Sequence, residues 1–423
     1  MSRRFMHLGQ AGTSTFAARV FAIGAVASIL APSAARADDE PPPAGESSDA
    51  ASPPEASAAA ASPSGAISVR GDSPPSVGPV ARGTDATSAP DAFSPWPTAR
   101  LALELEVFSS ARRSFQDGDD LSELRLDRGE LGARVAITPR AAAELRVEAI
   151  RSAGEGGALG VDGNSTVVRV KYAQVMGTLD AGPVRLDGAL GFVPDPWIRT
   201  LEDGYQLRPL SRVGSERLLG WPTADLSAQI RGSFGPARLT VAVGNGEGLR
   251  YPERNRGKTT TAVLEVVPLH TRSLRVSIAG VGRDGSLGAA SVRDRRAGGG
   301  ATVTTPYVRA GGEVVRAWGL GDRGEVEGTE LAGWLEVTPN AHLSLAARGS
   351  TLGVMDGRAS SFGGAIAASP WIAKTGDLRV WLAVDRQTTS GTASPLPGVD
   401  PGDATVVMLI ASATANFLVE PSP

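Results

Sequence analysis

The sequence predicts an all-β fold: a transmembrane antiparallel β-barrel of about sixteen strands, preceded by a disordered N-terminal arm. Three observations predict it. From residue 99 onward, segment after segment alternates apolar with polar or charged residues, so that one face of each segment is apolar and the other charged. Most segments run for about 9–14 residues, close to the length that a tilted membrane strand needs. Short and long polar links alternate between these segments, as in bacterial outer-membrane barrels.

The N-terminus has the three-part pattern of a secretory signal peptide. Arg3 and Arg4 give a positive start, residues 20–30 form an apolar run, and residues 35–37 supply a small-x-small cleavage site. We therefore expect residues 1–37 to be a signal peptide that is removed on export.

Residues 38–95 form a low-complexity stretch rich in Pro, Ala and Ser. They include almost no large apolar side chains, so ordering them would not be offset by burial. We expect a disordered periplasmic spacer here, and the transmembrane barrel over residues 96–418.

The composition excludes several functional classes. The chain has no Cys, which excludes disulfides and thiolate sites, and its net charge of −3 indicates no bulk attraction to nucleic acid. No later stretch reaches the roughly 18 apolar residues of a spanning helix. No acidic pair or His cluster has metal-ligand spacing, so neither a metal nor a cofactor is expected.

The alternating segments number sixteen, and an even number leaves both ends of the barrel on the periplasmic side. Gly311-Gly312 is interpreted as a tight turn, residues 284–302 as a long external loop, and a break in phase near Gly129 as a β-bulge. The predicted strands are residues 98–108, 122–137, 141–151, 165–179, 183–193, 223–234, 236–244, 259–268, 272–283, 303–310, 313–319, 328–338, 341–351, 359–371, 377–387 and 404–417.

A soluble periplasmic β-sandwich array or solenoid is the alternative fold, because soluble antiparallel sheets alternate too. Long strands, charges in mid-strand and the regular exchange of short and long links favour the barrel. Aromatic residues make up only 5% of the chain, so we expect thin aromatic girdles.

Short stretches between residues 165 and 350 carry a family resemblance. They are residues 170–175 (VKYAQV), 191–194 (GFVP), 225–232 (DLSAQIRG), 243–248 (VGNGEG), 333–337 (GWLEV) and 345–348 (LAAR). In these stretches the chain resembles the phosphate-selective porin O and P family and, more loosely, the sixteen-stranded porins. The resemblance implies an outer-membrane channel for passive diffusion of small hydrophilic solutes or ions, assembled as a homotrimer.

The same resemblance implies two further partners, the outer-membrane lipids and the barrel-assembly machinery. Phosphate-selective members rely on lysine clusters in the channel. This chain has only Lys171, Lys258 and Lys374, so the resemblance extends to the porin fold and its general task, not to phosphate selectivity.

The longest link, residues 194–222, is the third external loop of the predicted barrel. In the porins that the chain resembles, this loop folds into the lumen and narrows it, and rings of charge in such a constriction set ion preference. The alternative is a solvated surface loop with self-neutralising ion pairs. Its charged residues are Asp195, Arg199, Glu202, Asp203, Arg208, Arg212, Glu216 and Arg217.

The charged face of the strands is expected to line the lumen. Its basic residues nearly balance its acidic ones, which predicts at most a weak anion preference. The basic candidates are Arg134, Arg146, Arg169, Lys171, Arg231, Arg275, Arg348 and Arg379, and the acids that share this face are Glu104, Glu106, Glu144, Glu148, Glu265 and Glu336.

Two other functions compete with a pore. The first is a non-conducting outer-membrane barrel that acts as a receptor, adhesin or scaffold. The second is an outer-membrane hydrolase, because His342 and Ser344 share one strand face. A nucleophile needs a base within hydrogen-bond reach and a third group to orient that base. Only Asn340 is near, and His342 lies at a predicted periplasmic turn, so no enzymatic activity is expected.

Overall fold

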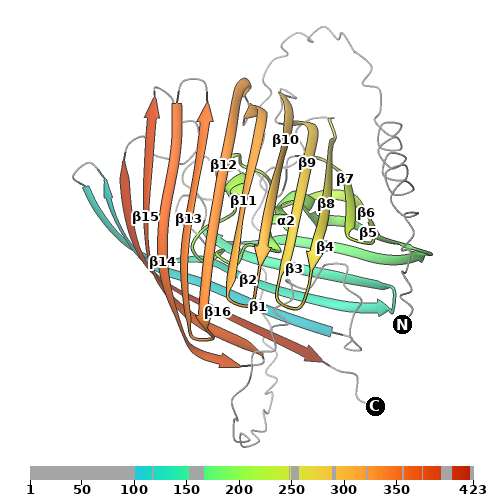
Figure 1. Cartoon of the computed structure of the whole chain (residues 1–423), viewed down its shortest axis with the longest axis horizontal. Coiled ribbons are helices and arrows are strands. Elements are labelled where there is room, and N and C mark those ends of the chain that lie inside the picture. The colour runs from blue at the N-terminus through green and yellow to red at the C-terminus, as the bar shows by residue number, and fades with distance from the viewer. Residues whose placement is uncertain are drawn as a thin grey trace, which may run out of the picture. The chain divides into compact units, whose positions relative to one another are not determined.

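The computed structural model contains a closed antiparallel barrel of sixteen strands, as the sequence predicts (Figure 1). Each strand pairs with its neighbours in sequence, and β1 (Leu101–Gln116) closes the barrel by pairing along its whole length with β16 (Ala404–Val419). The structure describes residues 101–116, 119–151, 166–246, 248, 257–287, 292–320, 323–354, 357–373, 375–391 and 403–419. The predicted signal peptide and spacer lie outside these residues, so both stay predictions.

The remaining elements follow one another around the barrel. The strands are β2 (Asp119–Thr138), β3 (Ala141–Arg151), β4 (Thr166–Ala181), β5 (Val184–Pro194), β6 (Ala224–Phe234), β7 (Ala237–Gly244), β8 (Thr259–His270), β9 (Arg275–Leu287), β10 (Val292–Thr304), β11 (Val308–Leu320), β12 (Arg323–Asn340), β13 (Leu343–Val354), β14 (Gly357–Ala373) and β15 (Gly376–Gly391). Two short helices, α2 (Pro196–Glu202) and α3 (Gly214–Leu218), lie between β5 and β6.

The two faces of the sheet differ as the alternation predicts. Leu145, Leu190 and Ile230 point outward and are at least half exposed, whereas their neighbours Glu148 and Arg231 are buried inside the barrel. The exterior is therefore an apolar surface and much of the interior is charged. A soluble sandwich would bury its apolar faces, so the structure excludes that alternative.

One end of the barrel carries only short turns. They connect the strands at residues 139–140, 182–183, 235–236, 271–274, 305–307 and 341–342. The longest connection, residues 195–223, lies at the opposite end. We refer to these as the turn end and the loop end.

The predicted strands 303–310 and 313–319 are wrong. Residues 292–304 form β10, the turn lies at residues 305–307, and Gly311 and Gly312 lie inside β11. The sequence signal failed because the loop-end half of β10 has arginines on both faces, so it lacks the apolar alternation of the other strands. The links predicted at 109–121, 320–327 and 352–358 are shorter than predicted, because the flanking strands continue into them.

Two of the register shifts on the β2–β4 side of the barrel lie close to its buried charges. The pairing of β1 with β2 shifts between Phe108 and Ser109, which leaves Asp127 unpaired and confirms the bulge predicted near Gly129. The pairing of β3 with β4 shifts at Lys171. A bulge re-aims side chains, and here both Lys171 and Tyr172 are buried.

Gly311 and Gly282 offer a matched test of the corrected strand assignment. A Cβ on Gly311 would overlap the Trp334 indole, whereas a Cβ on Gly282 would meet nothing within 4 Å. We expect Gly311→Ala to lower the free energy of unfolding by about 1–3 kcal/mol through overpacking, and Gly282→Ala to leave it nearly unchanged. Denaturant unfolding of the two variants measures the difference. Equal stabilities would place Gly311 in an open turn after all.

Candidate constriction loop and lumen wall

Residues 195–223, which we call the constriction loop, connect β5 to β6 and fold inward against the barrel wall. Local sequence starts the loop with a helix: the Asp195 side chain accepts hydrogen bonds from the backbone N–H of Trp197 (2.9 Å) and Ile198 (3.3 Å), and Pro196 occupies the first helical position. Asp195 also lies 3.5 Å from the guanidinium of Arg283 on β9, which ties the start of α2 to the wall.

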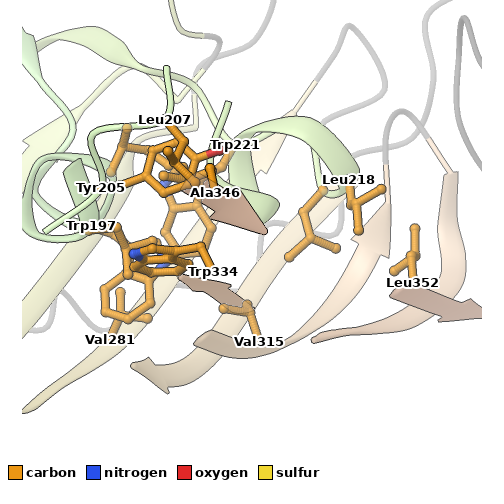
Figure 2. Close-up of a cluster of buried hydrophobic side chains, with 14 of the residues drawn as sticks. Trp197, Tyr205, Leu207, Leu218, Trp221, Val281, Val315, Trp334, Ala346 and Leu352 are labelled. Carbon is orange, nitrogen blue, oxygen red and sulfur yellow. The ribbon is translucent and has the colours of Figure 1, made fainter. Parts of the chain in front are cut away.

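The apolar side of the constriction loop packs against the inner face of one half of the barrel (Figure 2). Tyr205 meets Trp334 of β12 edge to face, with ring centroids 5.2 Å apart, and the Tyr205 hydroxyl donates to the carbonyl of Ser211 at 3.0 Å. The loop contributes Trp197, Ile198, Leu201, Tyr205, Leu207, Val213, Leu218, Leu219 and Trp221, and the wall contributes residues of β8, β9 and β11–β16, among them Val281, Val315, Leu352, Trp381 and Ile410. Burial of this surface fixes the loop inside the barrel.

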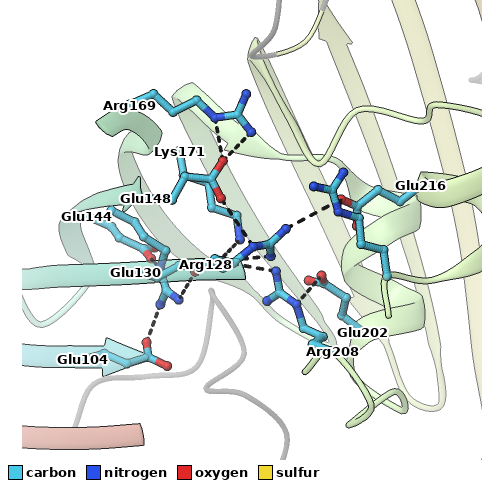
Figure 3. Close-up of polar contacts among 12 residues, drawn as sticks. Glu104, Arg128, Glu130, Glu144, Glu148, Arg169, Lys171, Glu202, Arg208 and Glu216 are labelled. Atoms are coloured by element: carbon cyan, nitrogen blue, oxygen red, sulfur yellow. Dashed lines mark hydrogen bonds and ion pairs between the residues drawn. The ribbon is translucent and has the colours of Figure 1, made fainter. Parts of the chain in front are cut away.

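The charged side of the loop meets the opposite wall, formed by β2–β4 (Figure 3). Glu130 of β2 lies at the centre, within 2.7 Å of Lys171 Nζ and 3.2 Å of both Arg146 and Arg128. Arg208 of the loop lies 3.6 Å from the same carboxylate and 3.2 Å from Glu202. One buried carboxylate therefore holds wall and loop cations together.

The network extends to either side of Glu130. On the wall, Arg169 binds Glu148 at 2.5 Å, and Arg146 also pairs with Glu104. On the loop, Arg212 pairs with Glu216 at 3.2 Å, and Glu216 lies 4.0 Å from Arg128. These contacts form a continuous chain of alternating charge from β1 to α3.

Burial and neighbouring cations shift the pKa values of the loop carboxyl groups in opposite directions. Burial raises the pKa of Glu202, but Arg208 and Lys171 outweigh it and hold that pKa below its usual range. Burial raises the pKa of Asp195, and Arg283 only partly offsets this. The Glu202 carboxylate is thus stabilised in its charged form, whereas the Asp195 carboxylate is not.

The predicted loop residues all lie in the constriction loop, and the structure brings most of them into ion pairs. Arg199 and Asp203 pair with each other at 3.7 Å, four residues apart, and Arg217 donates to the Ser350 hydroxyl of β13. Asp195, Glu202, Arg208, Arg212 and Glu216 make the contacts described above.

The predicted wall residues lie on the inward side of their strands but do not form one site. Arg146, Arg169 and Lys171 join the network around Glu130, whereas four others pair elsewhere on the wall. Arg231 donates to Thr240 (3.3 Å), Arg275 to Glu265 (3.3 Å), Arg348 to Asp385 (2.8 Å) and Arg379 to Asp377 (2.9 Å). Arg134 is partly buried on the inward face of β2.

The arginine is more exposed than its acid in most of these interior pairs. The Arg212 side chain is 39% exposed and that of Glu216 only 4%, and the values for Arg185 and Asp187 are 31% and 3%. The same order holds for Arg238 and Arg275 over Glu265, for Arg309 and Arg379 over Glu336, and for Arg348 over Asp385. The order is reversed between Glu104 and Arg146.

Several interior charges were missed by the sequence reasoning. Arg283 (β9), Asp294 and Arg296 (β10) form a buried cluster, with Arg283 3.0 Å and Arg296 2.8 Å from Asp294, and both guanidiniums lie over the Trp221 ring. Asp294 and Arg296 alternate with Arg293 and Arg295, so both faces of this stretch are charged and the sequence does not show which face points inward. Arg128 was missed because it lies next to the bulge in β2.

His342 and Ser344 do not interact with each other. The His342 ring contacts the carbonyl oxygen of Ser369 at 2.8 Å, and the nearest hydroxyl to Ser344 is that of Thr338 at 3.4 Å. Within the described residues, no group of three or more His, Cys, Asp or Glu is placed to hold a metal ion. No helix in that part of the chain is long and apolar enough to cross a membrane.

Solved structures share this fold at very low sequence identity. An anion-selective porin from Comamonas acidovorans superposes with a TM-score of 0.50 at 12% identity, over 75% of this chain and 100% of that chain. OprB of Pseudomonas putida gives 0.52 at 9% identity, over 75% and 94%. The outer-membrane protein OmpT of Vibrio cholerae gives 0.50 at 8% identity, over 76% and 99%.

No protein-family model matches the sequence, and no curated protein matches it. The structural likeness therefore establishes the fold: this chain has the closed-barrel architecture of outer-membrane porins.

Asp195 has two roles that substitutions can separate. Asp195→Ala removes both the helix cap and the Arg283 ion pair, and we expect it to cost the loop about 0.5–2 kcal/mol. Asp195→Asn keeps a capping oxygen and should cost less. Hydrogen exchange of the amides of α2 reports the local stability. If both variants exchange equally fast, the cap does not hold the loop.

Glu202 should make docking of the loop sensitive to acid. Its pKa is lower in the folded protein than in the unfolded chain, so its contribution is complete above the unfolded value and is lost as the pH falls through the folded value. We expect proteolysis of the constriction loop to accelerate below about pH 4. Glu202→Gln should show fast cleavage already at neutral pH and little further change on acidification. A steep acid dependence in Glu202→Gln would assign the effect to another group.

Proposed function

We propose that this protein is an outer-membrane pore that allows passive diffusion of small hydrophilic solutes or ions. One observation carries the proposal: a closed barrel has an apolar exterior and a charged interior into which a long loop folds. In hydrocarbon every backbone polar group must be satisfied within the protein, which a closed barrel achieves. A polar lumen then offers solutes a path across the membrane.

The proposed location is the outer membrane of a Gram-negative-type cell, reached by export with the signal peptide of residues 1–37. Outer-membrane lipids would cover the apolar exterior, and the barrel-assembly machinery would insert the chain. We further propose a homotrimer, and a place near the phosphate-selective porin O and P family. Phosphate selectivity itself is not part of the proposal, because Lys171 is buried against Glu130 and the chain has only two other lysines.

We also propose a weak preference for anions, with the eight charged loop residues and the eight basic wall residues named above as its site. The acidic and basic residues named above are nearly equal in number. A passing solute, however, contacts only the side chains that are exposed to the lumen. In most interior pairs the arginine side chain is more exposed than the acid that it pairs with. The accessible surface is thus more positive than the net charge, and rings of such charge favour anions.

A non-conducting barrel acting as receptor, adhesin or scaffold is the second candidate. One observation favours it: the apolar cluster between constriction loop and wall reaches strands from β8 to β16 and occupies part of the interior. Current through planar bilayers separates the two. A pore gives stepwise single-channel currents from purified, heat-modifiable protein. Absence of current from such protein would leave only the second candidate.

Arg212 is the most direct test of the anion preference. Its side chain is 39% exposed on the loop, whereas Arg295 is 50% exposed on the outer face of β10 and serves as the control. We expect Arg212→Glu to lower the anion-to-cation permeability ratio by about twofold or more, and Arg295→Glu to leave it unchanged. Reversal potentials in a salt gradient give the ratio. A cation-selective parent protein, or equal shifts in both variants, would contradict the assignment.

A further inference from the structure

The second helix of the constriction loop, α3, meets the barrel wall at two carboxyl groups. Glu313 of β11 accepts a hydrogen bond from the backbone N–H of Ser215 at 3.2 Å, and the Ser215 hydroxyl contacts its other oxygen. The Ser215 hydroxyl also accepts a hydrogen bond from Trp197 Nε1 at 3.1 Å. Glu313 thus anchors α3 to the wall and, through Ser215, contacts α2.

Glu330 of β12 lies beside this anchor and has no hydrogen-bond partner among the residues that the structure describes. Its side chain is completely buried, and neither carboxyl oxygen has a hydrogen-bond partner. A Cβ on Gly214 would lie within 3.0 Å of an oxygen of Glu330 and of one of Glu313. The two carboxyl groups are therefore within about 6 Å of one another, a range over which like charges disfavour ionisation.

Among the described residues no cation forms an ion pair or a hydrogen bond with Glu330. The charged groups around it are Glu313 from β11 and Arg217 from α3. Arg217 instead donates to Ser350 of β13, and its Nε is buried without a hydrogen-bond partner. From the other neighbouring strand, β13 places Leu352 opposite Glu330.

An ionised carboxylate in such a place is strongly disfavoured, because burial costs it its hydration and the neighbouring carboxylate repels it. We propose that Glu330 is protonated while the constriction loop is docked, and that loss of this proton releases α3 from the β11–β12 wall. The pair would act as a proton-controlled latch on the loop. The effect of this latch on solute passage depends on the proposed pore function, whereas the latch itself does not.

The charges define what release involves. The proton passes from the Glu330 carboxyl to water, and no covalent bond other than this O–H changes. The resulting carboxylate is buried without hydration and is repelled by Glu313, and both costs fall when α3 moves away and water reaches the two carboxyl groups. The movement breaks the hydrogen bonds between Ser215 and Glu313, whereas the attraction between Arg217 and the new carboxylate opposes it.

Glu336 provides a matched control. It lies on the same strand and the same inward face as Glu330 and is 2% exposed, but Arg309 and Arg379 each lie 3.7 Å from its carboxylate. Neutralising Glu336 therefore changes a buried carboxyl of β12 without touching the latch.

The absence of Cys from the chain allows a clean accessibility test. Leu218, at the end of α3, is 4% exposed and gives a reporter when changed to Cys. The rate of modification by a membrane-impermeant thiol reagent would be measured between pH 6 and 10 on full-length folded protein in vesicles, for Leu218→Cys alone and combined with Glu330→Gln or Glu336→Gln. Thiol ionisation is common to all three and cancels in the ratio of their rates.

We expect modification in Leu218→Cys and in the Glu336→Gln combination to rise at least tenfold above that in the Glu330→Gln combination as the pH increases. Equal pH profiles in all three would overturn the latch. As a second variant, Glu313→Gln removes the repelling charge, so release should occur at lower pH, and a shift to higher pH would also overturn it. Bilayer currents recorded in parallel keep the two proposals apart: a release step without any current supports the latch and sinks the pore.

Discussion

Burial of the apolar side of the constriction loop against the inner wall is the interaction on which the interior depends. Trp197, Leu201 and Trp221 would otherwise stand in a wet barrel, and the wall residues Trp334 and Trp381 would do the same. Packing them together is worth of the order of 1.5–3 kcal/mol for each large side chain. Because the loop is held on the β8–β16 side, Glu202, Arg208 and Glu216 face β2–β4, and the network around Glu130 follows from that placement (Figures 2 and 3).

This division of the interior also explains the pattern of exposure. Glu130 and Glu148 are each 1% exposed, whereas the Arg169 side chain that pairs with Glu148 is 16% exposed. In most interior pairs the arginine is therefore the more accessible partner. Net charge, the quantity available from composition, does not report which member of each pair is accessible.

The fold was predictable because a strand with one face in lipid and one in water must alternate, and most of these strands do. The prediction failed in β10, where Arg293 and Arg295 occupy the outer face of the loop-end half in place of large apolar residues. The constriction loop was predictable from its length and charge. Its contacts were not, because the partner of Arg208 is Glu130, and that pairing depends on how the whole barrel closes. Nothing in the sequence distinguishes Glu330 from the other acidic residues of the strands. Its lack of a hydrogen-bond partner among the described residues depends on the folded structure.

The placement of the constriction loop is the central claim, and a disulfide tests it most directly. A Cβ on Gly204 would lie 2.9 Å from the Cβ of Thr302, which faces inward on β10. In Gly204→Cys/Thr302→Cys, folded protein should form the crosslink on mild oxidation, since a disulfide joins Cβ atoms about 3.5–4.5 Å apart. Gly204→Cys/Val303→Cys, with its second thiol on the outer face, should stay reduced. Failure of the first pair, or crosslinking of both, would mean that the loop does not lie against this wall.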